Sequence, residues 1–319
     1  MRIRTTAATA AASVALLTGC SAGQGINVDE VPVPQPLPEG ATVSPDLEPV
    51  EVQETCEGGF DRTQSLKPSG ASAAKARAQL NDEDVISIGV SQTTNLMGYR
   101  DPSTGRLGGF DIDIATELAK AIGGEDVSIH WVPMTSGERE DALDSGRVDF
   151  VVRTMSMTCA RWENIEFSSV YLQAHQKTMV DSTSGIETLD DLTEDHTVCS
   201  SGGSTSLPQV LEQTSAQALT VKDFNDCISL LQRGTVDAFT TDDTILAGHA
   251  SQDPNLFILP DAIAEEPYGV GVAKGSTDLV EFINETLEKM REDGRWEAAY
   301  GKWLEGELGK TSPPKAEYR

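Results

Sequence analysis

Basic residues are scarce in this chain of 319 residues. It carries 24 Lys and Arg against 51 Asp and Glu, which gives a formal net charge of -27. Proteins that bind nucleic acid need basic faces, and so do proteins that adsorb to anionic lipid head groups. The composition therefore argues against both kinds of partner.

The sequence also lacks cysteines and histidines at the spacing that is typical of metal sites. No Cys-x-x-Cys occurs among the five cysteines, and His130, His175, His196 and His249 lie far apart without ligand spacing. We expect no metal and no cofactor. After the first residues, no segment is long and apolar enough to span a bilayer, which takes about 20 residues.

The first 20 residues have the form of a secretory signal. Arg2 and Arg4 precede a small and apolar run, residues 5–17, which is too short to be a comfortable membrane span. The run closes on Leu17-Thr-Gly-Cys20, which resembles a bacterial lipobox. The resemblance implies cleavage after residue 19 and a lipid on Cys20. The alternative is an ordinary signal peptide, 1–19, with a chance cysteine.

Residues 20–70 are expected to be an acidic tether. No Lys or Arg occurs between Cys20 and Arg62, and prolines recur among acids and small residues. Such a segment cannot bury enough apolar surface to fold, so we predict a semi-extended spacer. The prolines are Pro32, Pro34, Pro36, Pro38, Pro45 and Pro49.

A candidate anion site follows a short apolar run. Val148 to Val152 is typical of a buried strand, and hydroxyl-bearing residues and Arg161 come next. A guanidinium matches a carboxylate with two parallel hydrogen bonds. The alternative is a plain strand-to-helix connection with an incidental arginine. The hydroxyl residues are Thr154, Ser156 and Thr158.

Strands and helices alternate through the first half of the globular part. Phe110, Ile114, Leu118 and Ile122 recur at helical spacing, and Gly123-Gly124 ends that helix. The alternation predicts an α/β fold with a parallel sheet, whose ligands bind beyond the carboxyl ends of its strands. Expected helices are 73–80, 110–122 and 138–145, and expected strands are 85–90, 127–132 and 148–152.

A series of motifs in a fixed order resembles family 3 extracytoplasmic solute-binding proteins, the polar amino-acid receptors of ABC importers. The likeness covers roughly residues 84–305. Details such as Thr158-Cys-Ala-Arg161 are most similar to actinobacterial glutamate/glutamine-binding lipoproteins of the GlnH and GluB type. The motifs include Gly108-Gly-Phe-Asp-Ile-Asp-Ile-Ala115, Leu143-Asp-Ser-Gly-Arg-Val-Asp149, Gly202-Gly-Ser-Thr205, Thr240-Thr-Asp-Asp243 and Pro267-Tyr-Gly-Val-Gly-Val-Ala-Lys274.

The resemblance implies a two-lobed periplasmic-binding-protein-like fold of type 2. Two strands, near His175 to Asp181 and Ala262 to Tyr268, would cross between the lobes. Lobe 1 is expected over 71–178 and 267–305, lobe 2 over 179–266, and a flexible C-terminal tail over 306–319.

Four cysteines remain if Cys20 carries a lipid, and four cysteines allow three pairings. We favour Cys199–Cys227, because both would fall in lobe 2, and Cys56–Cys159 by elimination. The sequence alone does not decide the pairing.

The resemblance also suggests the ligand-binding residues. Arg161 matches the family arginine for the α-carboxylate, and Ser204 and Thr205 would hold the same group at a helix start. Asp242 matches the acid for the α-ammonium group, helped by Thr154 and Ser156. The alternative for Asp242 is a helix cap, a place that the neighbouring Asp243 could fill equally well.

Four further residues would determine which amino acid binds. A gapless comparison puts Asn95 where other members carry an aromatic residue, and Arg153 where some carry a serine. With Arg100 they suggest an acidic ligand side chain, and Gln176 could donate an amide to the same end. Arg153 could instead pair with an acid across the mouth of the lobes.

These features lead to one main function and one alternative. We expect an extracytoplasmic, monomeric receptor, lipid-anchored to the outer face of the cell membrane, that delivers glutamate, aspartate or their amides to an ABC permease. The alternative is a sensor whose closed form is recognised by a membrane signalling protein. An enzyme is not expected, because no nucleophile and base lie together at a strand end.

Overall fold

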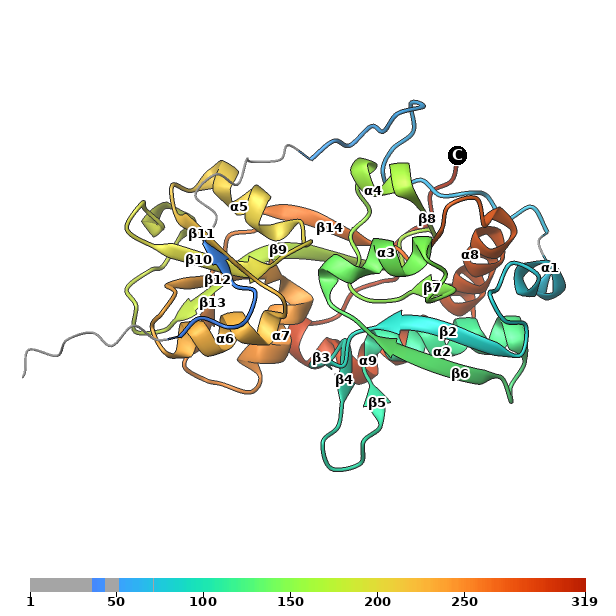
Figure 1. The fold of residues 1–319 in the computed structure, drawn as a ribbon, viewed down its shortest axis with the longest axis horizontal. Coiled ribbons are helices and arrows are strands. Elements are labelled where there is room, and N and C mark those ends of the chain that lie inside the picture. The colour runs from blue at the N-terminus through green and yellow to red at the C-terminus, as the bar shows by residue number, and fades with distance from the viewer. Residues whose placement is uncertain (1–35, 44–51, 71) are drawn as a thin grey trace, which may run out of the picture. The chain divides into compact units, whose positions relative to one another are not determined.

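The computed structural model of this chain describes residues 36–43, 52–70 and 72–319 (Figure 1). The expected signal peptide, Cys20 and the first part of the tether lie outside the described residues. None of the described helices is long and apolar enough to cross a membrane. Residues Leu37–Arg319 form one compact unit.

Lobe 1 is built on a five-stranded sheet in the order β6-β2-β7-β15-β8. Strands β6, β2 and β7 are parallel, whereas β15 is antiparallel to both of its neighbours. The bounds are β2 (Val85–Val90), β6 (Ser128–Pro133), β7 (Phe150–Val151), β8 (Ile165–Phe167) and β15 (Gly271–Ala273).

Helices cover this sheet, and their apolar spacing explains why. On α2 the four residues Phe110, Ile114, Leu118 and Ile122 are buried, and the Phe110 ring packs against Trp296. The helical segments of lobe 1 are α1 (Ala73–Arg77), α2 (Phe110–Gly123), η1 (Ser136–Glu138), α3 (Arg139–Asp144), α4 (Cys159–Asn164), α8 (Thr277–Glu292), α9 (Arg295–Trp303) and α10 (Glu305–Leu308).

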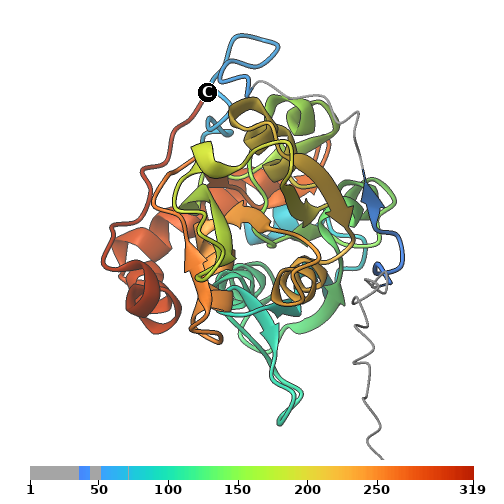
Figure 2. The same ribbon diagram turned by 90° about the vertical axis from the view of Figure 1, so that its left-hand side faces the viewer.

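A small antiparallel sheet is attached to lobe 1 and projects from it in Figure 2. Its strands are β3 (Thr93–Thr94), β4 (Gly98–Arg100) and β5 (Leu107–Gly108). The turn between β4 and β5 contains the sequence Asp101-Pro-Ser-Thr-Gly105, and Gly105 adopts a positive φ of 69° there.

Lobe 2 is built on a seven-stranded sheet in the order β1-β11-β10-β12-β9-β13, with β14 also paired to β9. Strands β11, β10 and β12 are parallel. The strands are β1 (Thr42–Val43), β9 (Leu172–Asp181), β10 (Thr197–Ser201), β11 (Gln217–Val221), β12 (Ala238–Asp242), β13 (Leu256–Ile258) and β14 (Ala264–Tyr268). The helices are η2 (Leu189–Asp191), α5 (Ser206–Gln213), α6 (Phe224–Gln232) and α7 (Asp243–Ala250).

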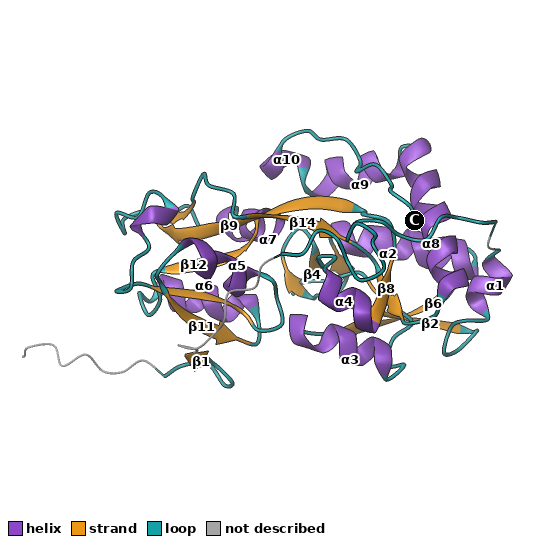
Figure 3. Cartoon of the chain, turned by 90° about the horizontal axis from the view of Figure 1, so that it is seen from above, coloured by secondary structure: helices purple, strands orange, loops and turns teal. Residues whose placement is uncertain are grey.

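Two strands connect the lobes, as expected. β9 and β14 run side by side as an antiparallel pair, from Leu172 opposite Tyr268 to Gln176 opposite Ala264 (Figure 3). β9 follows β8 of lobe 1, and β14 leads back to β15 of lobe 1. The expected α/β fold of two lobes with two crossing strands is therefore confirmed.

The tether prediction is wrong for the part that the structure describes. Cys56 is bonded to Cys159 of α4, and a second disulfide joins Cys199 to Cys227 in lobe 2. Arg62 is only 3% exposed and pairs with Glu54 at 2.9 Å. Residues 52–70 therefore pack on lobe 1.

A shorter piece of the same expected spacer belongs to lobe 2. Thr42 and Val43 form β1 and pair antiparallel with Thr220 and Leu219 on β11. Composition predicted an extended chain here, and the structure adds that this extended chain pairs with a sheet edge.

The expected flexible C-terminal tail is also corrected. Tyr318 pairs with Ser65 in a β-bridge and donates a 2.8 Å hydrogen bond to Glu288. The Arg319 guanidinium lies over the Phe60 ring at 3.8 Å. These contacts hold the last residues against residues 52–70.

Candidate functional site

An inner cavity of about 10 Å³ lies where the strand ends of both lobes meet. Six of the residues predicted to bind ligand line it: Thr154, Ser156, Arg161, Ser204, Thr205 and Asp242. The other lining residues are Ser136, Arg139, Ser206, Phe224 and Thr241.

Arg161 reaches the cavity from α4. The side chain of Thr158 caps this helix by accepting a 3.2 Å hydrogen bond from the Arg161 backbone N–H. The guanidinium donates to the Ser156 carbonyl at 2.7 Å and to the Gly203 carbonyl of lobe 2 at 2.9 Å. Its Nε lies 3.6 Å from a Glu140 carboxylate oxygen. Arg161 therefore joins both walls of the cavity.

Arg139, the first residue of α3, is a second buried arginine that the sequence analysis missed. Its guanidinium donates to four carbonyl oxygens, at distances between 2.8 and 3.2 Å. One acceptor is Gly203, which Arg161 also contacts. The acceptors in order along the chain are Ser136, Arg153, Thr154 and Gly203.

The two guanidinium groups give lobe 1 an excess of positive charge at the cavity. Burial, followed by repulsion from Arg161 and Arg153, lowers the pKa of Arg139 well below its ordinary value. Burial also lowers the pKa of Arg161, and Glu140 offsets part of that effect. No carboxylate within the described residues forms an ion pair with Arg139. Such a site favours an incoming anion.

Thr154 lines the cavity in a strained backbone conformation. Its φ is +37°, which is unusual for a β-branched residue. Asp111 of α2 holds it by accepting a 3.0 Å hydrogen bond from the Thr154 N–H and a 2.8 Å bond from the Tyr171 hydroxyl. Burial raises the pKa of Asp111 to about 7, although these hydrogen bonds act against the shift.

Lobe 2 contributes a glycine turn and the start of α5. The Ser204 hydroxyl donates to the Ser201 carbonyl at 2.7 Å, and the Thr205 hydroxyl donates to Glu266 at 2.9 Å. Because α5 begins at Ser206, its first backbone N–H groups lack partners within the helix and can receive an anion. This wall therefore faces the guanidinium groups with additional donors.

Asp242 ends β12 and supplies the negative group of the cavity. One carboxylate oxygen accepts a hydrogen bond from the Tyr268 hydroxyl, and the other, Oδ1, is buried and has no partner within the described residues. Burial, and then the charge of Glu266, raise the pKa of Asp242 well above its ordinary value. An unpaired buried carboxylate oxygen favours a cationic donor.

Two residues predicted to bind ligand lie away from the cavity. Arg100 is exposed on β4, where it donates to Gln92 and Gly105. Asn95 donates to the Gly248 carbonyl across the lobes at 3.2 Å. The turn after β3 places Asn95 of lobe 1 where it contacts α7 of lobe 2.

The two remaining residues predicted to bind ligand, Gln176 and Arg153, do not line the cavity but contact its surroundings. Both Gln176 hydrogen bonds from Nε2 go to protein acceptors, the Ser206 carbonyl and the Thr240 hydroxyl. The Arg153 guanidinium donates to the Met134 carbonyl at 2.7 Å and to the Ser136 hydroxyl at 2.8 Å. Arg153 therefore reaches the cavity only through Ser136, and the amide N–H groups of Gln176 are occupied.

A larger hollow of about 440 Å³ adjoins the cavity and shares Arg161, Ser204 and Thr205 with it. Val52 and Gln53 form another part of its lining. The described residues contain no group of three or more side chains that could hold a metal ion.

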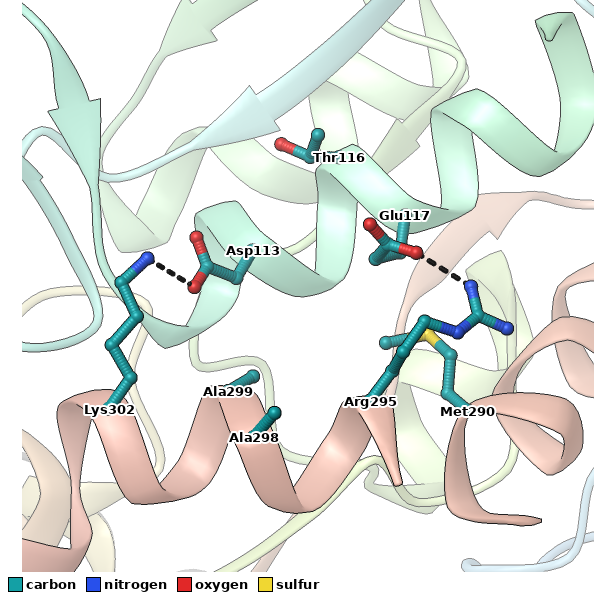
Figure 4. A pocket seen from close by; sticks show the side chains of 8 residues that line it. All are labelled: Asp113, Thr116, Glu117, Met290, Arg295, Ala298, Ala299 and Lys302. Atoms are coloured by element: carbon teal, nitrogen blue, oxygen red, sulfur yellow. Dashed lines mark hydrogen bonds and ion pairs between the residues drawn. The ribbon is translucent and has the colours of Figure 1, made fainter. Parts of the chain in front are cut away.

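A separate hollow between α2 and α9, of about 340 Å³, is less suited to a charged solute (Figure 4). Its charged groups neutralise one another, since Lys302 pairs with Asp113 at 2.8 Å and Arg295 with Glu117 at 2.6 Å (Figure 4). The inner cavity is therefore the candidate site.

Comparison with known proteins points to one family. Residues 86–306 match the bacterial extracellular solute-binding proteins, family 3. The glutamine-binding protein GlnH of an ABC transporter from Bacillus subtilis is 36% identical, covering 71% of this chain and 84% of that protein. The glutamate-binding protein GluB of Corynebacterium efficiens is 31% identical, covering 71% and 80%.

Solved structures of amino-acid-binding proteins are also similar to this chain. An ancestral arginine-binding protein bound to glutamine has a TM-score of 0.65 and 31% identity, covering 71% of this chain and 99% of that one. The same kind of ancestral protein bound to arginine has a TM-score of 0.64 and 32% identity, covering 69% and 98%.

Proposed function

This chain belongs to the bacterial extracellular solute-binding proteins of family 3, and we propose that the solute it binds is an acidic L-amino acid or its amide. Membership of the family makes the chain a solute receptor and not an enzyme. The residue roles that follow are part of the proposal.

The observation that carries the proposal is the separation of charge across one cavity. Two buried guanidinium groups, on Arg139 and Arg161, face it from lobe 1, and the buried carboxyl group of Asp242 faces it from lobe 2. An α-amino acid carries one negative and one positive group about one carbon apart. Its carboxylate matches the guanidinium groups, and its ammonium group matches the unpaired oxygen of Asp242.

Binding requires the lobes to separate and close again. A cavity of about 10 Å³ has room for no more than a water molecule, so an amino acid enters only when the walls part. The Gly203 carbonyl lies between the two guanidinium groups, and the ligand carboxylate would take over those donors. The N–H groups at the start of α5 would complete the carboxylate site, with Thr154 and Ser156 oxygens beside the ammonium group.

An acidic or amide side chain is favoured by the third buried guanidinium. Arg153 is 1% exposed and lies behind Ser136, so its charge acts on the cavity without a direct contact. Its nearest negative charges, Asp223 and Asp111, only partly offset the burial that lowers its pKa. Relatives that bind glutamine or glutamate support the same choice.

Delivery to an ABC permease and anchoring by a lipid on Cys20 complete the proposal. Relatives such as the GlnH protein of Bacillus subtilis are binding proteins of ABC transporters. Four or five charge-assisted hydrogen bonds of about 1.5–3 kcal/mol each, less the cost of immobilisation, correspond to a dissociation constant near micromolar.

Calorimetric titration of the oxidised protein with glutamate, aspartate, glutamine and asparagine tests this function. Arg161→Ala is expected to weaken binding at least about 100-fold, because it removes a charged donor from a buried site. The matched control is Arg147→Ala, which removes an exposed arginine of the same lobe. Equal glutamate affinity in Arg161→Ala and the parent would show that the site is assigned wrongly, and binding of none of the four would reject the function.

A further inference from the structure

Strand β14 carries two buried side chains that contact lobe 2. Glu266 and Tyr268 are two residues apart on a strand and therefore point to the same face. Glu266 accepts a hydrogen bond from Thr205 at 2.9 Å, and Tyr268 donates one to Asp242. Each of these two side chains thus holds a residue that lines the cavity.

The carboxyl groups of Glu266 and Asp242 share an unusual feature. Each is buried, and each keeps one oxygen, Oε2 of Glu266 and Oδ1 of Asp242, that has no hydrogen-bond partner within the described residues. Buried acceptors are normally satisfied. Each carboxyl group can therefore accept one more hydrogen bond, and a positively charged donor would satisfy such an oxygen.

The charges around Asp242 are mostly negative. Glu266 is the strongest charged neighbour, and Asp243 adds to it, whereas Arg139 acts in the opposite direction. The Tyr268 hydroxyl stabilises the ionised carboxylate by donating to it. Burial and these negative charges raise the pKa of Asp242 well above its ordinary value.

Further charged groups on β9, α7 and lobe 1 lie around Glu266 and Asp242. On β9 the register partner of Glu266 is Ala174, and the adjacent His175 faces Asp243 at 3.4 Å. The charges of Glu266 and Asp242 also act on Arg161 of lobe 1, where they offset part of the lowering of its pKa. Arg139 and Arg161 thus act against burial and the charges of Glu266 and Asp243, and the raised pKa of Asp242 shows that burial and the acids prevail there.

Building on the proposed function, we infer that Glu266 is a positioning residue of the ammonium site, and that its charge keeps on Asp242 a proton that is exchanged for the ligand ammonium group. Glu266 acts through Asp242 and Thr205 and does not itself line the cavity. The ammonium group keeps its three protons and donates to the unpaired Oδ1 of Asp242, while the proton of Asp242 leaves to solvent. Binding therefore releases up to one proton, and affinity rises with pH while Asp242 is protonated.

Calorimetric titration with L-glutamate in buffers of different ionisation enthalpy counts the released protons. The oxidised full-length protein is expected to release close to one proton per glutamate over part of the range between about pH 5 and 8. Glu266→Gln keeps the shape but leaves a single acid, so the count is expected to fall below about one third and the affinity to lose most of its pH dependence. A purely structural role would leave the count unchanged.

Glu265→Gln is the matched control, because it removes the same charge from an exposed position on the same strand. It is expected to release as many protons as the parent. If Glu266→Gln does not fold, Tyr268→Phe serves instead. Loss of the phenolic donor makes Asp242 harder to ionise, so proton release should extend to higher pH.

The outcomes separate this inference from the receptor function. Glutamate binding by the parent without proton release, or an unchanged count in Glu266→Gln, overturns the inference and leaves the receptor function intact. If the parent binds none of the four amino acids, the receptor function fails, and this inference fails with it.

Discussion

The guanidinium of Arg161 in lobe 1 donates a 2.9 Å hydrogen bond to the backbone carbonyl of Gly203 in lobe 2. Arg139 donates to the same oxygen at 3.1 Å. Two positive groups of one lobe thus meet at a single backbone oxygen of the other. The glycine turn therefore joins the two lobes, and in the proposed complex a ligand carboxylate would replace its carbonyl as the acceptor of these hydrogen bonds.

Replacing Gly203 by alanine is expected to prevent full closure. A Cβ there would lie 2.6 Å from the Gly137 Cα of lobe 1, a backbone atom, and the residue's φ is +76°. The lobes would have to stay further apart, so glutamate affinity should fall by about tenfold or more. Titration calorimetry measures the affinity, and small-angle X-ray scattering with saturating glutamate measures the separation.

Gly185→Ala is the control for backbone strain. Gly185 also lies in lobe 2 and has a φ of +81°, but nothing lies within 4 Å of its added Cβ. This variant should lose stability without losing glutamate affinity. Equal affinity losses in the two variants would mean that contact with Gly137 does not limit closure.

Arg153→Gln is expected to change the preference among ligands. Glutamine can still donate to the Ser136 hydroxyl but carries no charge. Glutamate affinity should fall by about tenfold, while glutamine affinity should change by less than about threefold. The comparison is made by titration of both ligands, with Arg147→Gln as the exposed control. A parallel loss for both amino acids would reject the idea that Arg153 senses side-chain charge.

Asp111 should make the protein less stable as pH rises. Burial raises its folded-state pKa to about 7 from 3.8, so its contribution is fully present below about pH 4 and is lost as pH rises through about 7. The loss amounts to roughly 4 kcal/mol for this group. Asp111→Asn should remove that decrease, as measured by urea unfolding at a series of pH values with disulfides intact.

Asp101→Asn provides the opposite case for the same measurement. Hydrogen bonds from Ser103 lower the pKa of Asp101, so its stabilising contribution is lost only as pH falls into the acid range. The Asn variant should therefore differ from the parent above that range and converge with it at the acid end. If Asp111→Asn gave this pattern, Asp111 would be ionised in the folded protein at low pH, contrary to our assignment.

The sequence predicted the parts of the site that follow strand ends. Thr154, Ser156 and Arg161 follow β7, and Asp242 ends β12, so local patterns and motif order could locate them. Their roles in binding stay predictions. The alternation of strands and helices predicted the α/β class, whereas the two lobes and their crossing strands were implied by the resemblance to solute-binding proteins.

Arg139 and Glu266 could not be identified in the same way. Both are buried by contacts with residues more than 60 positions away, Gly203 for Arg139 and Thr205 for Glu266. Local patterns do not encode such burial, and a charged residue in a polar stretch is usually exposed. The prediction of a tether over residues 52–70 was wrong for a related reason. The composition of this segment suggests a spacer, whereas Cys56 and Ser65 are held in place by distant partners.

Trp162 follows Arg161 on α4 and lies where residues 52–70 and the C-terminal residue Arg319 meet lobe 1. Its indole N–H donates to the Arg62 carbonyl at 2.7 Å, its ring packs edge-on against Phe60, and the Arg319 guanidinium lies 4.7 Å above it. An indole in such contacts changes its emission when any of them is lost. The protein thus contains its own fluorophore, next to Arg161, for following undocking of residues 52–70 or of the C-terminus by optical spectroscopy.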